Sequence, residues 1–193
     1  MNRVSSVAVV LFAGFFMAFS SNAQADNTLN INLLYSQKSM EKWRNELKES
    51  PAYGIEGDFG LGSLPINLWL GVSSGKDSSK GVSQGLAISL DANQTEMYIG
   101  ARTYLQFVPL ITPYFGAGVS TVKAEISGKS SGVSSSYSAT TTGYLLNAGV
   151  LFRIGAFQIG GDYRILSGTS FDFAGAYSNV NYSQVGVVAG LNF

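Results

Sequence analysis

Residues 184–193, with the sequence QVGVVAGLNF, decide the fold of this chain. Side chains alternate between the two faces of a β-strand, so residues two apart share a face. One face of this segment is apolar throughout and consists of Val185, Val187, Ala189, Leu191 and Phe193. The other face carries small and mixed side chains, among them Gln184, Gly186, Gly190 and Asn192. The alternation predicts a strand that has one fully apolar face and ends on an aromatic residue.

Seven further segments alternate in the same way, at residues 29–37, 53–60, 66–74, 95–104, 112–121, 143–152 and 157–166. Their lengths approach the ~9–11 residues with which a tilted strand crosses the hydrocarbon core of a membrane. Their charged residues all lie on the face opposite the apolar one: Glu56, Asp58, Glu96, Arg102, Asp162 and Arg164. A charge in contact with lipid is costly, so the apolar face should meet lipid and the charged face should line a lumen. We therefore expect an all-β fold, an eight-stranded antiparallel up-and-down transmembrane β-barrel.

The connections between these segments alternate in length. Residues 61–65, 105–110 and 153–156 form short turns, whereas residues 37–52, 74–93, 125–142 and 167–180 form longer polar stretches. This rhythm is typical of bacterial outer-membrane barrels, whose termini both lie at the short-turn, periplasmic end. Charged residues make up only 12% of the chain and divide into 12 basic and 12 acidic side chains. Without a clustered basic excess, nucleic acid is not an expected partner.

The first 25 residues are expected to be a secretory signal peptide that is removed. Arg3 precedes the uncharged apolar run at residues 7–19, and Ala23 and Ala25 provide a small-x-small cleavage site. The apolar run is too short to span a membrane. Cleavage after Ala25 would leave residues 26–193 as a single barrel domain. The chain contains no cysteine, so we expect neither a disulfide nor a lipid-attachment cysteine.

On these residues, the chain resembles the small eight-stranded outer-membrane barrels of Gram-negative bacteria, the group that contains the OmpX, OmpA-transmembrane and OmpW-like families. The resemblance rests on the periodicity, on the strand PYFGAGVS at residues 113–120 and on the terminal VGVVAGLNF. It implies that Phe193 is the signal by which the outer-membrane assembly machinery recognises the last strand. It also implies a location in the cell outer membrane, in contact with lipid and lipopolysaccharide.

The expected lumen charges have three interpretations. Glu56 and Asp58 could form an acid/base pair, they could line a gated ion path, or they could pair with Arg102 and Arg164 in a structural network. Side chains nearly fill the interior of an eight-stranded barrel and buried charges need partners, so the network is the favoured interpretation. The chain has no histidine, which excludes a Ser-His triad and a His-ligated metal. We therefore expect no enzyme activity, no metal site and no cofactor.

The expected role is a structural or surface-interaction one, in which the four long loops are presented to an extracellular ligand on a rigid scaffold. The alternative is a narrow channel for ions or small solutes, as in OmpW-like porins. In the first loop, Met40, Trp43 and Leu47 have helical spacing, so Trp43 is a candidate anchor at the membrane interface; an ordinary solvated turn fits equally well. Residues 127–142, SGKSSGVSSSYSATTT, are expected to form a flexible surface loop.

Overall fold

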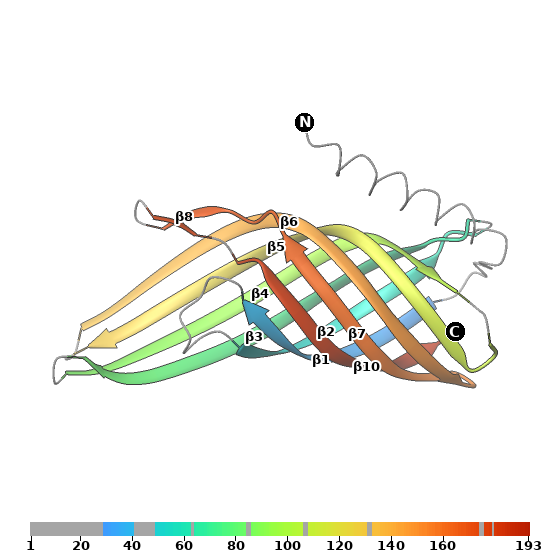
Figure 1. The fold of residues 1–193 in the computed structure, drawn as a ribbon, viewed down its shortest axis with the longest axis horizontal. Coiled ribbons are helices and arrows are strands. Elements are labelled where there is room, and N and C mark those ends of the chain that lie inside the picture. Colours follow the sequence, from blue (N-terminus) through green and yellow to red (C-terminus); the bar gives the residue numbers. More distant parts are fainter. Residues whose placement is uncertain are drawn as a thin grey trace, which may run out of the picture.

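A computed structural model describes residues 29–40, 49–62, 64–83, 86–105, 108–130, 133–173, 176–178 and 180–193. Eight antiparallel strands close into one barrel in the order β1-β10-β7-β6-β5-β4-β3-β2 (Figure 1). The barrel strands are β1 (Leu29–Met40), β2 (Glu49–Gly60), β3 (Asn67–Ser83), β4 (Leu86–Tyr104), β5 (Ile111–Ser130), β6 (Val133–Ile154), β7 (Phe157–Ser167) and β10 (Tyr182–Asn192). A small hairpin, β8 (Phe171–Phe173) and β9 (Ala176–Ser178), lies between β7 and β10 in the chain. The expected fold class is confirmed.

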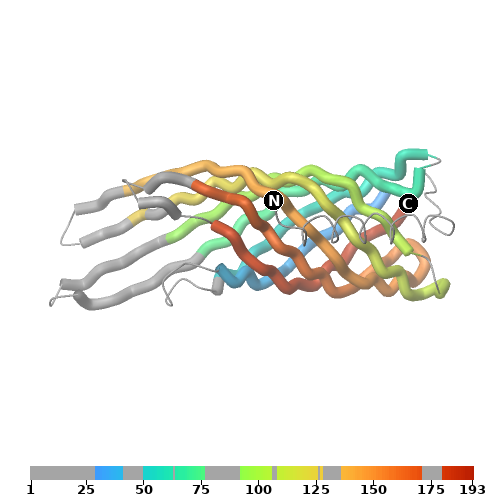
Figure 2. Tube along the Cα trace, turned by 45° about the horizontal axis from the view of Figure 1, so that its top comes forward, coloured from blue at the N-terminus to red at the C-terminus, as the bar shows by residue number. Residues whose placement is uncertain are grey.

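The first and last strands close the barrel. The backbone amides of Leu29 and Phe193 each donate to the other residue's carbonyl oxygen, at 3.1 and 2.9 Å. When the hydrogen-bonded partners are followed once around the wall from Asn30, the path returns to Met40, ten residues further along β1. This stagger sets a strand tilt of roughly 40°, and the strands wind obliquely around a common axis (Figure 2).

Side chains alternate between the two sides of the wall along most of each strand. The outward-facing apolar side chains form a continuous apolar belt, made of Ile31, Leu33, Tyr35, Tyr53, Ile55, Phe59, Leu70, Val72, Met97, Ile99, Phe115, Val119, Tyr144, Leu146, Val150, Phe152, Phe157, Ile159, Tyr163, Ile165, Val185, Val187 and Leu191. At the end away from the short turns, the belt gives way to exposed polar residues, which are Gln37, Ser74, Thr95, Thr121, Thr142 and Ser167. Tyr35 and Tyr53 stack near this border with ring centroids 5.1 Å apart, as aromatic side chains do at a membrane interface.

Short turns lie at one end of the barrel, as the sequence predicts. The β2–β3 and β6–β7 connections each contain a glycine with positive φ, 65° at Gly62 and 61° at Gly155. This backbone conformation is unfavourable for other residues, so glycine permits the tight reversal. The C-terminus lies at the same end, because Asn192 donates its backbone amide to the carbonyl oxygen of Ala156 at 2.8 Å.

Most of the predicted boundaries of the long loops are wrong, because the strands continue into the segments that were expected to be loops. β3 and β4 remain paired from Lys76↔Asn93 to Ser83↔Leu86, within the expected loop 74–93. β5 and β6 remain paired up to Ser130↔Val133, within the expected flexible loop 127–142. The four strands form a projecting sheet beyond the belt, made of residues 76–83, 86–93, 125–130 and 133–138 (Figure 1).

The first long connection also begins later than expected. Met40 is the last residue of β1, so it does not start a helix, and Glu49 already belongs to β2. Trp43 and Leu47, like the expected signal peptide at residues 1–25, lie outside the described residues. In the part of the chain that is described, no helix is long and apolar enough to cross a membrane.

Candidate functional site in the barrel interior

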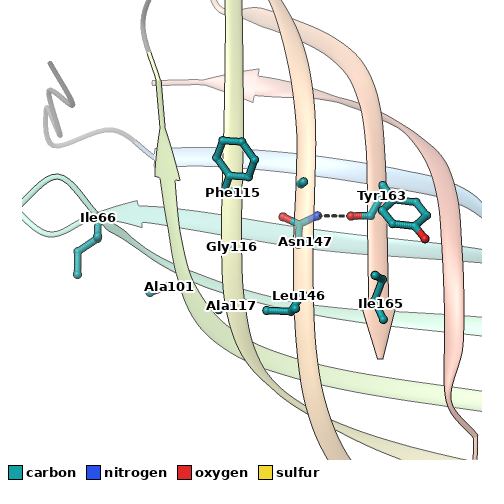
Figure 3. Close-up of a pocket in the computed structure, with 10 residues that line it drawn as sticks. Ile66, Ala101, Phe115, Gly116, Ala117, Leu146, Asn147, Tyr163 and Ile165 are labelled. Carbon is teal, nitrogen blue, oxygen red and sulfur yellow. Dashed lines mark hydrogen bonds between the residues drawn. The ribbon is translucent and has the colours of Figure 1, made fainter. Parts of the chain in front are cut away.

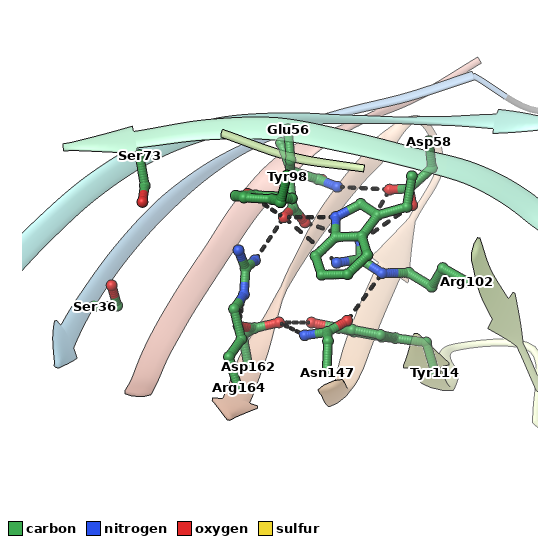
Figure 4. A network of polar contacts seen from close by, with 12 residues as sticks. Ser36, Glu56, Asp58, Ser73, Tyr98, Arg102, Tyr114, Asn147, Asp162 and Arg164 are labelled. Carbon is green, nitrogen blue, oxygen red and sulfur yellow. Dashed lines mark hydrogen bonds and ion pairs between the residues drawn. The ribbon is translucent and has the colours of Figure 1, made fainter. Parts of the chain in front are cut away.

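The barrel interior holds a buried group of charged side chains. We call Glu56, Asp58, Arg102, Asp162 and Arg164 the central cluster (Figure 4). They come from three strands, β2, β4 and β7, and point to a common centre because alternation turns each of them inward. Each is less than 5% exposed. Five of the six charges that the sequence places in the lumen therefore lie together; the sixth, Glu96, does not.

Arg102 joins two carboxylates. Its Nη1 donates to Glu56 Oε1 at 2.9 Å and to Asp58 Oδ2 at 3.0 Å. Its guanidinium lies 4.3 Å from the ring centroid of Trp69 and 4.7 Å from that of Tyr114. A planar cation is attracted to aromatic ring faces, and the attraction increases where water is excluded. Arg102 is thus held both by charge and by stacking.

Arg164 links the same glutamate to the opposite wall. It donates from Nη2 to Glu56 Oε2 at 2.5 Å and from Nε to Asp162 Oδ1 at 2.6 Å. Asp162 also accepts a hydrogen bond from Asn147 Nδ2 at 2.5 Å, and Asn147 Oδ1 accepts one from Arg102 Nε at 3.0 Å. These contacts close a ring of hydrogen bonds across the lumen. Buried charges are tolerated when they are paired and hydrogen-bonded in this way.

Glu96 forms a second, separate ion pair. Its partner is Lys38, whose Nζ lies 2.5 Å from Glu96 Oε2, and both side chains are 1% exposed. Ser120 and Tyr182 donate to the other carboxylate oxygen at 2.6 and 2.5 Å. Gln37 and Thr95, which directly precede these two residues in the chain, belong to the polar border of the belt, so the pair lies near the end with the projecting sheet. Glu96 thus faces the lumen as the sequence predicts, but its cation partner is Lys38 and not Arg102 or Arg164.

Lys38 is the main residue that sequence reasoning missed. It lies one position beyond the segment expected to be a strand, residues 29–37. Its signal was nevertheless present, because Asn32, Leu34 and Ser36 share its face in unbroken alternation. Asn147 also faces the lumen, and alternation alone does not indicate that it links Arg102 to Asp162. Trp69 Nε1 and Tyr98 OH, which donate to Glu56 Oε2 at 3.2 and 3.1 Å, likewise carried no assigned role.

A group of apolar side chains, which we call the apolar lid, lies in the interior beyond the Lys38–Glu96 pair. It consists of Met40, Val122, Ala124, Val180 and Tyr182, which are all less than 10% exposed and pack in one cluster. At this level the outward positions of β5 are polar, with Lys123 and Glu125 paired on the surface at 2.6 Å. The arrangement of polar and apolar faces is thus the reverse of that within the belt. This reversal indicates that the barrel extends beyond the membrane into water, where apolar side chains form its interior core.

The charged side chains of the interior are paired by direct contacts, and few of the described buried polar groups are left over. Among the described buried side chains, both amide atoms of Gln184 and of Gln94, Asn30 Nδ2 and the Tyr104 hydroxyl lack a hydrogen-bond partner. No group of three or more His, Cys, Asp or Glu side chains in the described ranges is arranged to hold a metal ion. Phe193, the last residue of the chain, is 63% exposed, and its side chain faces outward.

A closed barrel with an apolar outer belt and a charged, buried interior defines a membrane-spanning β-barrel protein of the outer-membrane type. The chain belongs to the family described as the outer membrane protein beta-barrel domain, whose model matches residues 8–193. The protein is therefore located in the outer membrane.

Solved structures of other small barrels have the same fold. The attachment invasion locus protein Ail of Yersinia pestis, in complex with the heparin analogue sucrose octasulfate, has a TM-score of 0.55 at 15% identity, over 86% of this chain and 97% of that one. Neisserial surface protein A has a TM-score of 0.55 at 14% identity, over 86% and 96%. The N-terminal barrel of Pseudomonas aeruginosa OprF has a TM-score of 0.53 at 16% identity, over 88% and 100%. The curated proteins contain no match.

Proposed function

We propose that this protein is a non-enzymatic surface-interaction protein, in which a closed barrel holds the projecting sheet away from the membrane for contact with an extracellular ligand. The observation that carries this proposal is the combination of an interior crossed by buried ion pairs with strands that extend past the belt. In this arrangement the short-turn end is periplasmic and Phe193 serves as the assembly signal on the last strand. The central cluster and the Lys38–Glu96 pair then act as structural braces of the scaffold.

The outer elements are held firmly, which suits a presenting role. Among the described residues, β3 has no pairing with β2 beyond Gly75, and β6 pairs with β7 only from Tyr144 onward, so the sheet extends past these neighbouring strands. Its four strands exceed a two-stranded hairpin, which is marginally stable alone. Next to it, the Thr141 hydroxyl donates to the carbonyl oxygen of Ser170 at 3.0 Å and accepts from that residue's amide at 3.1 Å.

The chemistry of the ligand is open in this proposal, and the similar fold of Ail supplies a first probe. That protein was crystallised with a heparin analogue. A heparin-coated surface and cultured animal cells are therefore the ligands with which to begin. Both would be offered to bacteria that carry this chain in their outer membrane.

Shortening the β3–β4 hairpin is expected to abolish this binding without unfolding the barrel. Lys76 and Asn93 are paired, so residues 77–92 can be replaced by a two-residue Asn-Gly turn that joins these two positions. The belt and the interior contacts remain intact, so the shortened chain should still fold, as its altered gel mobility before and after boiling will show. Bacteria with the full chain should bind above the empty-vector level, and bacteria with the shortened chain should not.

A matched variant shortens β5–β6 instead, at the pair Glu125↔Ser138. Loss of binding in either folded variant supports the proposal, and the comparison shows which hairpin makes the contact. Binding that is equal in the full-length and both shortened proteins would refute it.

The second candidate function, a narrow channel for ions or small solutes, is favoured by one observation. The side chain of Gln184 is buried in the lumen with both amide atoms unpartnered, as a group that contacts permeating water would be. Against this, the apolar lid and the central cluster lie in the lumen on either side of Gln184, where ions would have to pass. We therefore place the channel second.

A further inference from the structure

The outer wall of the barrel contains a groove within the apolar belt. It has a volume of about 440 Å³ and lies over β4, β5, β6 and β7 (Figure 3). Its floor consists of Ala101, Ala117 and Ala148, three outward-facing alanines on neighbouring strands. Ala101 and Ala117 are cross-strand partners, and Ala148 pairs with Phe115. Larger side chains form the margins, so the groove results from the register that brings the small residues together.

The groove runs across much of the belt. Ile66, the residue that precedes β3, lies at the end of the groove nearest the short turns. Ile165 lies at the other end, two positions before Ser167, where the outward face of β7 becomes polar. Leu146 lies between these ends, because it pairs with both Ala117 and Ile165. The lining residues thus follow neighbouring strands from one side of the belt to the other, a course that suits an extended hydrocarbon chain.

We propose that the groove binds a single acyl chain of an outer-membrane lipid. The belt lies in the hydrocarbon of the membrane, so only hydrocarbon or another protein can meet the alanines there. The wall of a second barrel is convex and cannot follow a narrow concave groove, whereas a flexible chain can. Lipid tails are as apolar as the groove, so the preference comes from dispersion contacts that an unfilled hollow would lose. A volume of about 440 Å³ falls within the range of ligand pockets.

Trp69 can serve as an intrinsic fluorescent reporter for the groove, because it lies inside the barrel directly behind it. Gly116 lines the groove, and a Cβ built on it would lie 3.5 Å from Cε3 of Trp69, which is inside the barrel. The Trp69 indole is 0% exposed, so it is separated from the groove by only the thickness of the wall. The chain has two tryptophans, and Trp43→Phe leaves Trp69 as the only one.

The test is fluorescence quenching of the Trp43→Phe protein in vesicles of phosphatidylcholine, a minor fraction of which carries a bromine-labelled acyl chain. Ala117→Phe fills the groove from its floor. Ala189→Phe is the matched control, because Ala189 is also an outward, exposed alanine but lies on β10, away from the groove. We expect the parent and Ala189→Phe to show the same quenching of Trp69, and Ala117→Phe to lose a large part of it. Equal quenching in all three proteins would overturn the proposal.

Two further measurements keep the test decisive. Ala148→Leu fills a different part of the floor, and if Ala117→Phe fails to fold, Ala148→Leu should lose the same quenching. Native mass spectrometry of protein extracted from vesicles should show one retained lipid in the parent and in Ala189→Phe that the filled variants lack. Quenching that increases when the groove is filled would also overturn the proposal, because it would mean that protein, as in contact between two copies, normally covers the groove.

Discussion

Replacing Arg102 by alanine is expected to destabilise the barrel by about 3–5 kcal/mol, the cost typical of removing one partner from a buried ion pair. The central cluster contains three carboxylates and only two guanidiniums. Arg102 Nη1 donates a hydrogen bond to Asp58 Oδ2 at 3.0 Å and another to Glu56 Oε1 at 2.9 Å. Without it, both carboxylates would remain buried in the membrane-spanning part of the barrel with Arg164 as the only cation of the cluster. The measurement is equilibrium unfolding in urea, in lipid vesicles.

Two variants provide controls for this experiment. Lys123→Ala removes a cation from an exposed pair, in which the side chains are 55% and 46% exposed, and should change stability by less than about 1 kcal/mol. Arg102→Lys keeps the charge but loses the planar group that stacks on Trp69 and Tyr114, so it should lie between the parent and Arg102→Ala. An Arg102→Ala protein as stable as Lys123→Ala would show that the cluster does not support the barrel.

Two adjacent glycines in β7 are expected to respond in opposite ways to alanine. A Cβ on Gly160 would run into the backbone carbonyl oxygen of Val150 and would lie 2.9 Å from the Cα of Leu151, on the paired strand β6. A Cβ on Gly161 would have no atom within 4 Å. Backbone cannot move aside as a flexible side chain can, so Gly160→Ala should force β6 and β7 apart at a cost of about 1–3 kcal/mol.

Gly161→Ala is the matched control in the same strand. The methyl group points outward into free space and reduces the freedom of the unfolded chain, so stability should stay equal or rise by up to about 1 kcal/mol. The same unfolding measurement in vesicles compares the two variants. Similar destabilisation by both substitutions would mean that flexibility of the strand, and not close approach inside the barrel, requires glycine at position 160.

The fold was predictable from the sequence because lipid imposes one rule on every strand of the belt. Apolar residues must face outward at every second position, which is visible in stretches such as residues 184–193. The strand ends were missed because this rule stops applying at the border of the belt. Beyond this border, Val122 and Ala124 face inward while Thr121 and Lys123 face outward, so the apolar face is now the inner one. A strand whose outer face is polar resembles a polar loop in the sequence.

The interior was predictable only in part. Alternation places Glu56, Arg102 and Arg164 on the inner face, but it cannot tell which charges lie at the same height, because height depends on the stagger between strands. The pairing of Glu96 with Lys38 follows from a register that the sequence does not state. The groove over the three alanines was missed for the same reason, since they meet only when β4, β5 and β6 are aligned.

The proposed surface role requires that the lumen does not conduct, so that the function is carried out by the strands outside the membrane. Single-channel conductance of residues 26–193, refolded into a planar lipid bilayer, tests this requirement most directly. We expect a correctly inserted barrel to give no discrete openings, because the apolar lid and the central cluster lie in the lumen, where ions would have to pass. Reproducible openings whose size or ion preference changes in Glu56→Gln or Arg102→Lys would contradict this requirement and would identify the protein as a channel.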